Sequence, residues 1–252
     1  MICPRSQKNS SAEIVSNRIP EWTFRLLQSE NWGISGVSQK KAIRDGDCDM
    51  VMLARPLLAD PDWCNKAFAG NVEEIRPCIG CQEGCVNEFI LGGHPQCAVN
   101  PRTDSRNVSG TFTPAEKKKN IAVVGGGPAG ITFALIAAKR GHNVTLYEKS
   151  EKLGGKIAVG SIPKIKFDLR NYLAYLEKQV ELCQEQYQLQ VHKNTTVTAE
   201  LLKRKKHMIQ LFFLRMEQRK IFPPFEGREE ANLILGTDLL EHPEKAEGAN
   251  NI

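Results

Sequence analysis

The pattern of apolar and polar residues is clearest in the middle of the chain. Residues 120–124 form a β-branched run, which predicts a buried strand, and residues 131–140 are rich in Ala, Leu and Ile, which predicts a helix. Gly141 follows as the expected end of that helix, and residues 143–148 predict a second strand. The order strand, helix, strand predicts an α/β unit with parallel strands.

A longer amphipathic pattern follows this unit. Over residues 168–186, Tyr172, Leu173, Leu176 and Val180 fall on one side of a helix, because they recur at spacings of three and four. Such a stripe is typical of a helix that packs on a core, and we predict a packing face here.

The first part of the chain carries a weaker pattern. Residues 39–45 predict a helix that ends at Gly46, residues 48–54 predict a short buried strand, and a short helical piece then runs toward Ala69. The first 35 residues show no period, so they stay unassigned and we expect them, like the segment after Lys206, to be poorly packed.

Composition places the chain among ordinary globular proteins. It has 252 residues, 41% hydrophobic and 25% charged, and a net charge of +5 that is spread along the sequence. The densest basic run, residues 203–206, has no interleaved aromatic residues, which argues against nucleic-acid binding. No apolar stretch approaches the ~20 residues that span a bilayer and no signal peptide follows Met1, so we expect a cytoplasmic protein without a membrane partner.

Four of the eight cysteines are clustered. Cys78, Cys81, Cys85 and Cys97 have the spacing C-x2-C-x3-C-x11-C, in which three thiolates and a returning fourth can surround a [4Fe-4S] cluster. A structural zinc site, which usually uses two separated cysteine pairs, and unliganded thiols remain alternatives. The other four are expected to be ordinary thiols: Cys3, Cys48, Cys64 and Cys183.

A glycine motif lies between the first strand and the helix of the α/β unit. Gly125 permits a tight turn, Gly127 lets backbone approach a pyrophosphate, and Gly130 lets helix and strand pack closely. Pro128 and Ala129 complete the G-x-G-x-x-G pattern. The motif predicts a dinucleotide site, and a Rossmann unit without a ligand is the alternative.

An acidic residue and a second glycine pair refine this prediction. Glu148 ends the next strand, where a carboxylate accepts hydrogen bonds from ribose hydroxyls and repels an NADP 2′-phosphate. Lys149 follows it and joins the predicted cofactor-binding set. Gly154 and Gly155 resemble the pair that follows the ribose acid in flavoproteins with two dinucleotide domains, which favours FAD over NAD.

Three motifs together resemble one family. Residues 49–61 (DMVMLARPLLADP), the cysteine segment that ends in CAVNPR at residue 102, and the glycine strand are similar to 2-enoate reductase and bacterial 2,4-dienoyl-CoA reductase. The resemblance runs from about residue 36 to 203 and resumes from 223 to 248. It implies an Old Yellow Enzyme-like (β/α)8 barrel with FMN, a [4Fe-4S] cluster, and an FAD/NAD(P)H module, which together reduce activated C=C bonds.

The resemblance also implies an α/β fold class with three parts: the end of a (β/α)8 barrel, a cysteine-rich cluster segment and a partial Rossmann-like FAD-binding domain. In that comparison Arg55 lies where a barrel binds the phosphate of FMN. The implied domains are 1–35 unassigned, 36–75 barrel remnant, 76–102 iron-sulfur segment, 103–119 linker, 120–203 FAD-binding half and 204–252 diverged tail.

The chain departs from the family in three ways. About one β/α unit precedes the cysteines, so we expect an incomplete barrel whose lone strand has unpaired edges and no catalytic residue. No second nucleotide domain for NAD(P)H is expected. Residues 207–221 diverge where the family has a strand and a glycine turn, and we hypothesise that this segment is translated in a shifted frame.

These departures leave three hypotheses of function. The first is a fragment of an iron-sulfur flavoprotein oxidoreductase that is inactive alone. The second is a non-catalytic electron-transfer or FAD-binding module that works with a separate barrel subunit or self-associates. The third is a zinc-stabilised nucleotide-binding protein.

Overall fold

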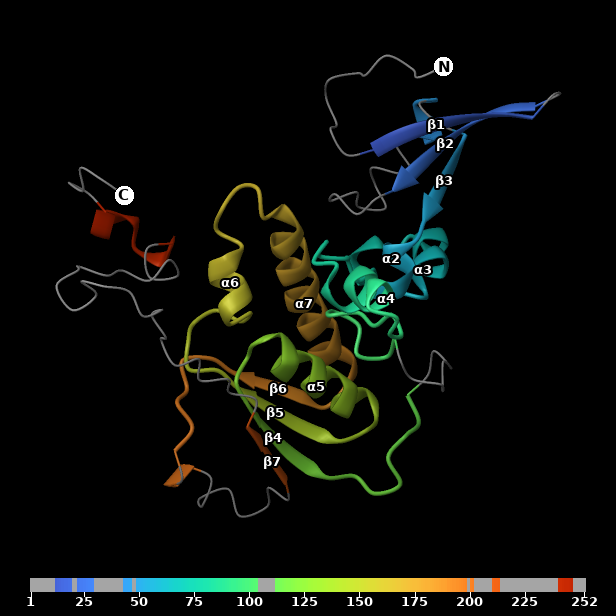
Figure 1. Cartoon of the computed structure of the whole chain (residues 1–252). Helices are drawn as coiled ribbons and strands as arrows, with labels where there is room; N and C mark the ends of the chain where they lie inside the picture. Colours follow the sequence, from blue (N-terminus) through green and yellow to red (C-terminus); the bar gives the residue numbers. More distant parts are fainter. Residues whose placement is uncertain are drawn as a thin grey trace. The chain divides into compact units, whose positions relative to one another are not determined.

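The computed structural model divides the chain into two compact units, residues 1–111 and 112–252 (Figure 1). We call them the cysteine unit and the dinucleotide unit. The structure describes residues 12–19, 22–29, 43–46, 49–103, 112–198, 200–201, 210–213 and 240–246. Among these residues, no helix combines the length and the apolar character needed to cross a bilayer. Cys3 and Cys48 lie outside the described residues.

The cysteine unit contains one small sheet and several short helices. Its elements are β1 (Ala12–Ile19), β2 (Trp22–Ser29), β3 (Met50–Leu53), α2 (Arg55–Ala59), α3 (Trp63–Ala69), the 3₁₀-helix η1 (Val72–Glu74), the π-helix η2 (Glu83–Asn87) and α4 (Glu88–Ile90). β1 and β2 pair antiparallel, from Ala12 opposite Ser29 to Ile19 opposite Trp22. β3 then pairs in parallel with β2, with Met50 opposite Leu26.

This sheet corrects two expectations. The strand at residues 50–53 is not a lone strand, because β2 supplies hydrogen-bonding partners along one of its edges. β1 and β2 lie in the part of the chain for which the sequence predicted no element. The predicted helix end at Gly46 is confirmed: its φ is 74°, and its N–H donates to the carbonyl of Ile43 at 3.1 Å.

The dinucleotide unit is built on a parallel sheet. Its elements are β4 (Asn120–Val124), α5 (Pro128–Lys139), β5 (Asn143–Tyr147), α6 (Lys156–Gly160), α7 (Phe167–Gln186), β6 (Leu189–His192), β7 (Gln210–Phe213) and the 3₁₀-helix η3 (Pro243–Ala246). The strand order is β6-β5-β4-β7, and each neighbouring pair runs parallel. A parallel sheet with helical crossovers is the Rossmann-like arrangement predicted from the sequence.

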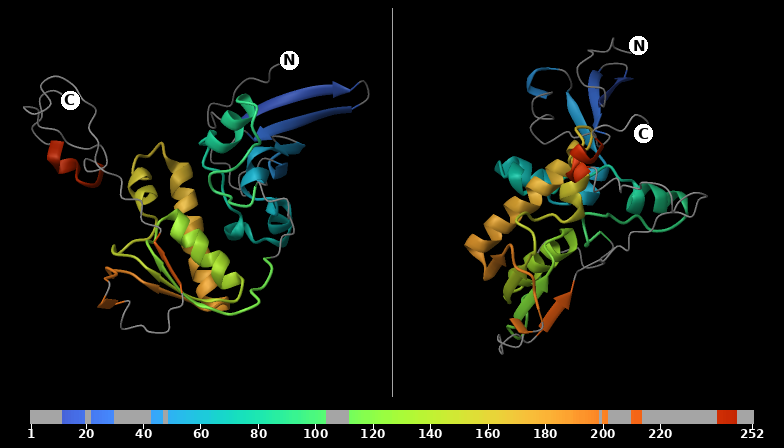
Figure 2. Two further views of the ribbon diagram at one scale, coloured as in Figure 1. Left: turned by 60° about the horizontal axis from the view of Figure 1, so that its bottom comes forward. Right: turned by 90° about the vertical axis from the view of Figure 1, so that its left-hand side faces the viewer.

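Helices α5 and α7 cover the same face of this sheet and pack on each other (Figure 2). On α5 the buried side chains recur at the helical spacing, with Ile131, Ala134 and Ala138 at most 1% exposed. On α7, Tyr172, Leu176 and Val180 are buried, which confirms the predicted packing stripe. The middle of β4 is buried on both faces, as expected for a central parallel strand.

Two elements of this unit differ from the sequence prediction. Helix α5 begins at Pro128 rather than at residue 131, because a proline at the first helical position lacks only an N–H that would be unpaired there. Ala129 and Gly130 therefore belong to its first turn. β7 forms within the segment that was predicted to be poorly packed, and it pairs with β4 from Ile121 opposite Gln210 to Val124 opposite Phe213.

Candidate functional site

The four predicted cysteine ligands lie on one loop of the cysteine unit. We call residues 78–97 the cysteine loop. The backbone N–H of Gly80, which has a φ of 65°, points at the sulfur of Cys78 at 3.5 Å. Cys85 lies in the π-helix η2, in which the N–H of Asn87 donates to the carbonyl of Gln82 at 3.0 Å. Gln82 itself has a positive φ of 57°, which is uncommon outside glycine.

A backbone contact at Gly84 closes the part of the loop between Cys85 and Cys97. The N–H of Gln96 donates to the carbonyl of Gly84, so the following residues, Cys85 and Cys97, become neighbours. A side chain at Gly84 would crowd this contact, because a Cβ there would lie 3.1 Å from the carbonyl oxygen of Gln96. This backbone link closes the long interval between the third and fourth cysteines.

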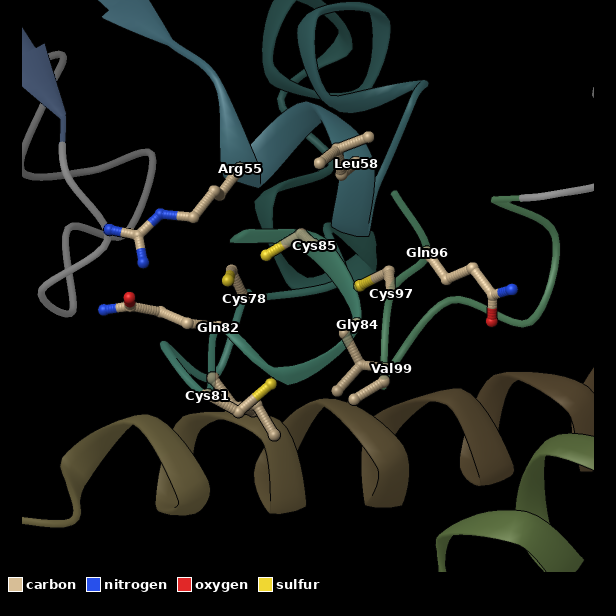
Figure 3. A pocket seen from close by; sticks show the side chains of 12 residues that line it. Arg55, Leu58, Cys78, Cys81, Gln82, Gly84, Cys85, Gln96, Cys97 and Val99 are labelled. Atoms are coloured by element: carbon tan, nitrogen blue, oxygen red, sulfur yellow. The ribbon is translucent and has the colours of Figure 1, made fainter. Parts of the chain in front are cut away.

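All four cysteines line a single pocket, the cysteine pocket, together with Arg55 and other residues of the same unit (Figure 3). Cys78, Cys85 and Cys97 are half-buried thiols, whereas Cys81 is exposed and lies on the side of the pocket away from α2. No group of three or more His, Cys, Asp or Glu side chains in the described ranges is gathered closely enough to hold one metal ion. The structure therefore brings the four thiols to one pocket without a disulfide bond between them.

The glycine motif forms a tight loop between β4 and α5. Gly125 has a φ of 109°, and its N–H donates to the carbonyl of Tyr147 at 2.8 Å. A Cβ on Gly130 would overlap the carbonyl oxygen of Gly125, whereas a Cβ on Gly127 would meet no atom within 4 Å. The space in front of Gly127, at the N-terminus of a helix of twelve residues, is where a pyrophosphate would lie.

Glu148 is fixed beside this loop. It is 7% exposed, and its carboxylate accepts the N–H of Gly126 at 2.6 Å and the N–H of Ser150 at 2.9 Å. Each carboxylate oxygen can accept a second hydrogen bond, so ribose hydroxyls can still donate to it. Lys149, the next residue, is exposed.

The second glycine pair packs directly on the first glycine loop. The N–H of Gly154 donates to the carbonyl of Gly126 at 2.8 Å. Gly155 has a φ of 53°, and a Cβ on it would lie 3.2 Å from the Cα of Gly127. The structure thus brings Gly125, Gly127, Gly130, Glu148, Gly154 and Gly155 to one place.

Burial shifts the pKa of two residues in the dinucleotide unit. It lowers the pKa of His142 below 6.5, and the positive charges of Arg140 and Lys119 lower it further. The neutral ring accepts the N–H of Lys119 at its Nδ1, 3.2 Å away. Burial also raises the pKa of the Cys183 thiol, which keeps this cysteine protonated and unreactive, as predicted for an ordinary buried thiol.

Three comparisons relate these sites to known proteins. Residues 123–174 match the family model of an NAD(P)-binding Rossmann-like domain. A metal reductase of Desulforamulus reducens is 32% identical over 205 residues, which are 81% of this chain and 30% of that protein. A cinnamate reductase of Clostridium sporogenes is 43% identical over 136 residues, which are 54% of this chain and 20% of that protein. The structure of a 2-naphthoyl-CoA reductase in complex with 2-naphthoyl-CoA aligns with a TM-score of 0.70 and 30% identity, over 81% of this chain and 30% of that one.

The chain belongs to the 2-enoate reductase and 2,4-dienoyl-CoA reductase family. It spans less than a third of the length of these relatives. The resemblance read from the three sequence motifs is therefore confirmed, and the Rossmann-like domain of the family is present in the dinucleotide unit.

Two buried polar residues of this enoate reductase-type chain escaped the sequence prediction. Asp60 and Asn100 are each 3% exposed, and both are hydrogen-bonded beside the cysteine loop. The signal that could have found them is the proline that follows each one, because Asp-Pro and Asn-Pro pairs favour turns in which the polar side chain bonds nearby backbone.

Proposed function

We propose that this chain binds a [4Fe-4S] cluster through Cys78, Cys81, Cys85 and Cys97 and binds FAD at the dinucleotide loop. In this proposal it forms part of an NAD(P)H-dependent reductase of activated C=C bonds. When bound, the cluster supplies one-electron transfer between flavins. The chain's own residues bind and orient these groups.

The observation that carries the proposal is that four thiols of a single loop line the same pocket. Each thiolate of a [4Fe-4S] cluster binds a different iron atom, so the four sulfurs need not meet at one point as they would around zinc. The backbone N–H of Gly80 near the sulfur of Cys78 supports the same assignment, since such groups stabilise cluster thiolates. The donor set fits an iron-sulfur cluster better than a structural zinc ion.

Assignment of FAD to the dinucleotide loop rests on Glu148 and the second glycine pair. The carboxylate disfavours a cofactor with a 2′-phosphate, which removes NADP as the ligand of this loop. Gly154 and Gly155 pack against Gly126 and Gly127, so the second pair forms part of the same site. Lys149, Pro128 and Ala129 complete the proposed set of residues near the cofactor.

FMN and its barrel are a further part of the proposal. Arg55 would bind the FMN phosphate by paired hydrogen bonds from its guanidinium group. It lines the cysteine pocket, so a flavin phosphate held there would lie close to the proposed cluster. A partner subunit that carries such a barrel is part of the same proposal. Thiols that must remain reduced to bind iron also support a cytoplasmic location.

Anaerobic purification followed by metal, sulfide and flavin analysis tests the proposal. We expect a brown protein with about four irons and four sulfides per chain, and bound FAD. Replacing the ligand in Cys97→Ser should remove most of the iron, whereas Cys64→Ser should keep it, because Cys64 is exposed on α3 and outside the cysteine loop. A colourless protein that carries one zinc ion per chain would contradict the cluster assignment.

A further inference from the structure

The two ends of the cysteine loop are anchored at the same place in the cysteine unit. Arg76 precedes the first cysteine by two residues, and its backbone N–H donates to Oδ2 of Asp60 at 2.8 Å. Asn100 follows the last cysteine by three residues, and its Nδ2 donates to the carbonyl of Leu58 at 2.8 Å. Leu58 and Asp60 are the C-terminal end of α2 and the residue that follows it.

Both anchors are held rigidly by a second bond. Oδ1 of Asp60 accepts the N–H of Asp62 at 3.1 Å, and Oδ1 of Asn100 accepts the N–H of Arg102 at 3.1 Å. Each side chain therefore uses one oxygen to fix its own turn and its other polar atom to reach across to a distant segment. Buried side chains with all polar groups bonded lose little freedom when they hold a neighbour in place.

The charge of Asp60 is neutralised within the same network. Lys66 donates to Oδ2 of Asp60 at 2.7 Å and to the carbonyl of Glu74 at 3.1 Å, and the Asp60 side chain is only 4% exposed. The guanidinium of Arg76 adds a bond to the carbonyl of Ala59 at 3.1 Å. Hydrogen bonds to a buried carboxylate are stronger than those between neutral groups, so this anchor resists opening.

We infer that Asp60 and Asn100 are positioning residues that clamp both ends of the cysteine loop to the end of α2 and so hold its thiols in the arrangement that binds the cluster. This inference rests on the proposed function. Neither side chain supplies a ligand. Residues that orient ligands in this way commonly change metal affinity by about 10- to 100-fold when they are replaced.

The test uses the full chain, purified without oxygen and loaded with iron and sulfide. Asp60→Asn replaces one carboxylate oxygen, which now accepts a backbone N–H, with an NH₂ group that cannot accept one. Asn100→Asp keeps the hydrogen bond from the N–H of Arg102 but loses the one to the carbonyl of Leu58. Asp62→Asn is the control, because the Asp62 side chain is exposed and makes no capping hydrogen bond at α3. The chelator-driven iron release rate and the electron paramagnetic resonance spectrum of the reduced protein are measured for each.

We expect Asp60→Asn and Asn100→Asp to release iron about tenfold faster than the wild-type chain and to give broader electron paramagnetic resonance spectra. Asp62→Asn should match the wild type in both measurements. Should Asp60→Asn fail to fold, Asn100→Asp alone decides, because it leaves the ion pair between Asp60 and Lys66 in place. Wild-type release rates and spectra in both variants, with only a lower unfolding midpoint, would overturn the clamp and leave the cluster assignment intact. A wild-type chain that binds no iron would overturn the cluster assignment and the clamp with it.

Discussion

Gly127 and Gly130 lie three residues apart in the dinucleotide loop, yet different contacts require them to be glycine. Gly130 faces the carbonyl of Gly125, so any side chain would push helix α5 away from strand β4. Gly127 faces open space and has a φ of −76°, which any residue can adopt. Gly130 is therefore needed for folding, and Gly127 is needed for the approach of the cofactor.

This difference predicts opposite behaviour for two alanine variants. Gly130→Ala should lower the free energy of unfolding by about 1–3 kcal/mol, as overpacking in a tight contact does. Gly127→Ala should unfold like the wild type but bind FAD more weakly, since its methyl group occupies the pyrophosphate position. Urea denaturation and FAD titration of both variants check this, and equal loss of stability in the two would contradict it.

We expect His142 to make the stability of the dinucleotide unit depend on pH. The pKa of His142 is lowered in the folded chain, first by burial, so the unfolded chain binds a proton more readily than the folded one. Protonation would also place an N–H at Nδ1, opposite the N–H that Lys119 donates to it. The stabilising contribution is complete above pH 6.5 and is lost as the pH falls from 6.5 toward the folded pKa.

We therefore expect the urea midpoint of the dinucleotide unit to fall between pH 7 and pH 5. His142→Asn should make this fall shallower, because an amide oxygen can accept the N–H of Lys119 without titrating. Tyrosine fluorescence, measured during urea denaturation at several pH values, follows the unfolding of the dinucleotide unit. An identical pH slope in the variant and the wild type would assign the effect to other groups.

At the scale of elements, Arg170 determines how α6 joins α7. Its guanidinium donates to the carbonyls of Ser161 at 2.8 Å, Pro163 at 2.7 Å and Lys164 at 2.6 Å. These carbonyls belong to Ser161, which caps the C-terminus of α6, and to two residues of the turn that follows. The N-terminus of the same helix follows Gly155, which contacts the dinucleotide loop.

Loss of the three hydrogen bonds made by Arg170 should loosen the connection between α6 and α7. Arg170→Met should speed amide hydrogen exchange around residues 161–166 and cost about 1 kcal/mol of stability, because three hydrogen bonds to backbone carbonyls are lost. Lys178→Met serves as the control, since the pair of Lys178 with Glu181, at 3.4 Å, is exposed and contributes little. Amide exchange that is as slow in Arg170→Met as in the control would show that the hydrogen bonds of Arg170 are not needed to hold this connection.

The elements that sequence could predict are those with a local signal. β4, β5 and α7 carry runs and stripes that reflect burial on one or two faces, and the structure has all three. β1 and β2 have no such period; two residues separate the paired Ile19 and Trp22, which was the available hint of a hairpin. β7 was missed because its sequence differs from that expected of the family, although parallel pairing with β4 depends on backbone rather than on particular side chains.

The candidate site also has features that the sequence predicts and features that it does not. The cysteine spacing and the glycine motif could be read from the sequence because the chemistry requires those residue types at fixed intervals. The link between Gly84 and Gln96, and the bonds from Asp60 and Asn100 across to other segments, could not. They join residues far apart in the sequence through single polar groups, which leave no period.

At the scale of the whole molecule, the two units carry different natural fluorophores. All three tryptophans, Trp22, Trp32 and Trp63, belong to residues 1–111. All four tyrosines lie in residues 112–252: Tyr147, Tyr172, Tyr175 and Tyr187. Tryptophan fluorescence therefore reports unfolding of the cysteine unit and tyrosine fluorescence reports unfolding of the dinucleotide unit.

A ligand stabilises the part of a chain that binds it in the folded state, by an amount set by its concentration relative to its dissociation constant. We expect removal of iron with a chelator to lower the urea midpoint seen by tryptophan, because the cysteine loop belongs to that unit. Added FAD should raise the midpoint seen by tyrosine, because at 100 times its dissociation constant it adds about 2.7 kcal/mol to the free energy of unfolding. A tryptophan midpoint that is the same with and without iron would mean that the metal does not stabilise the cysteine unit, and would contradict a cluster held within the cysteine loop.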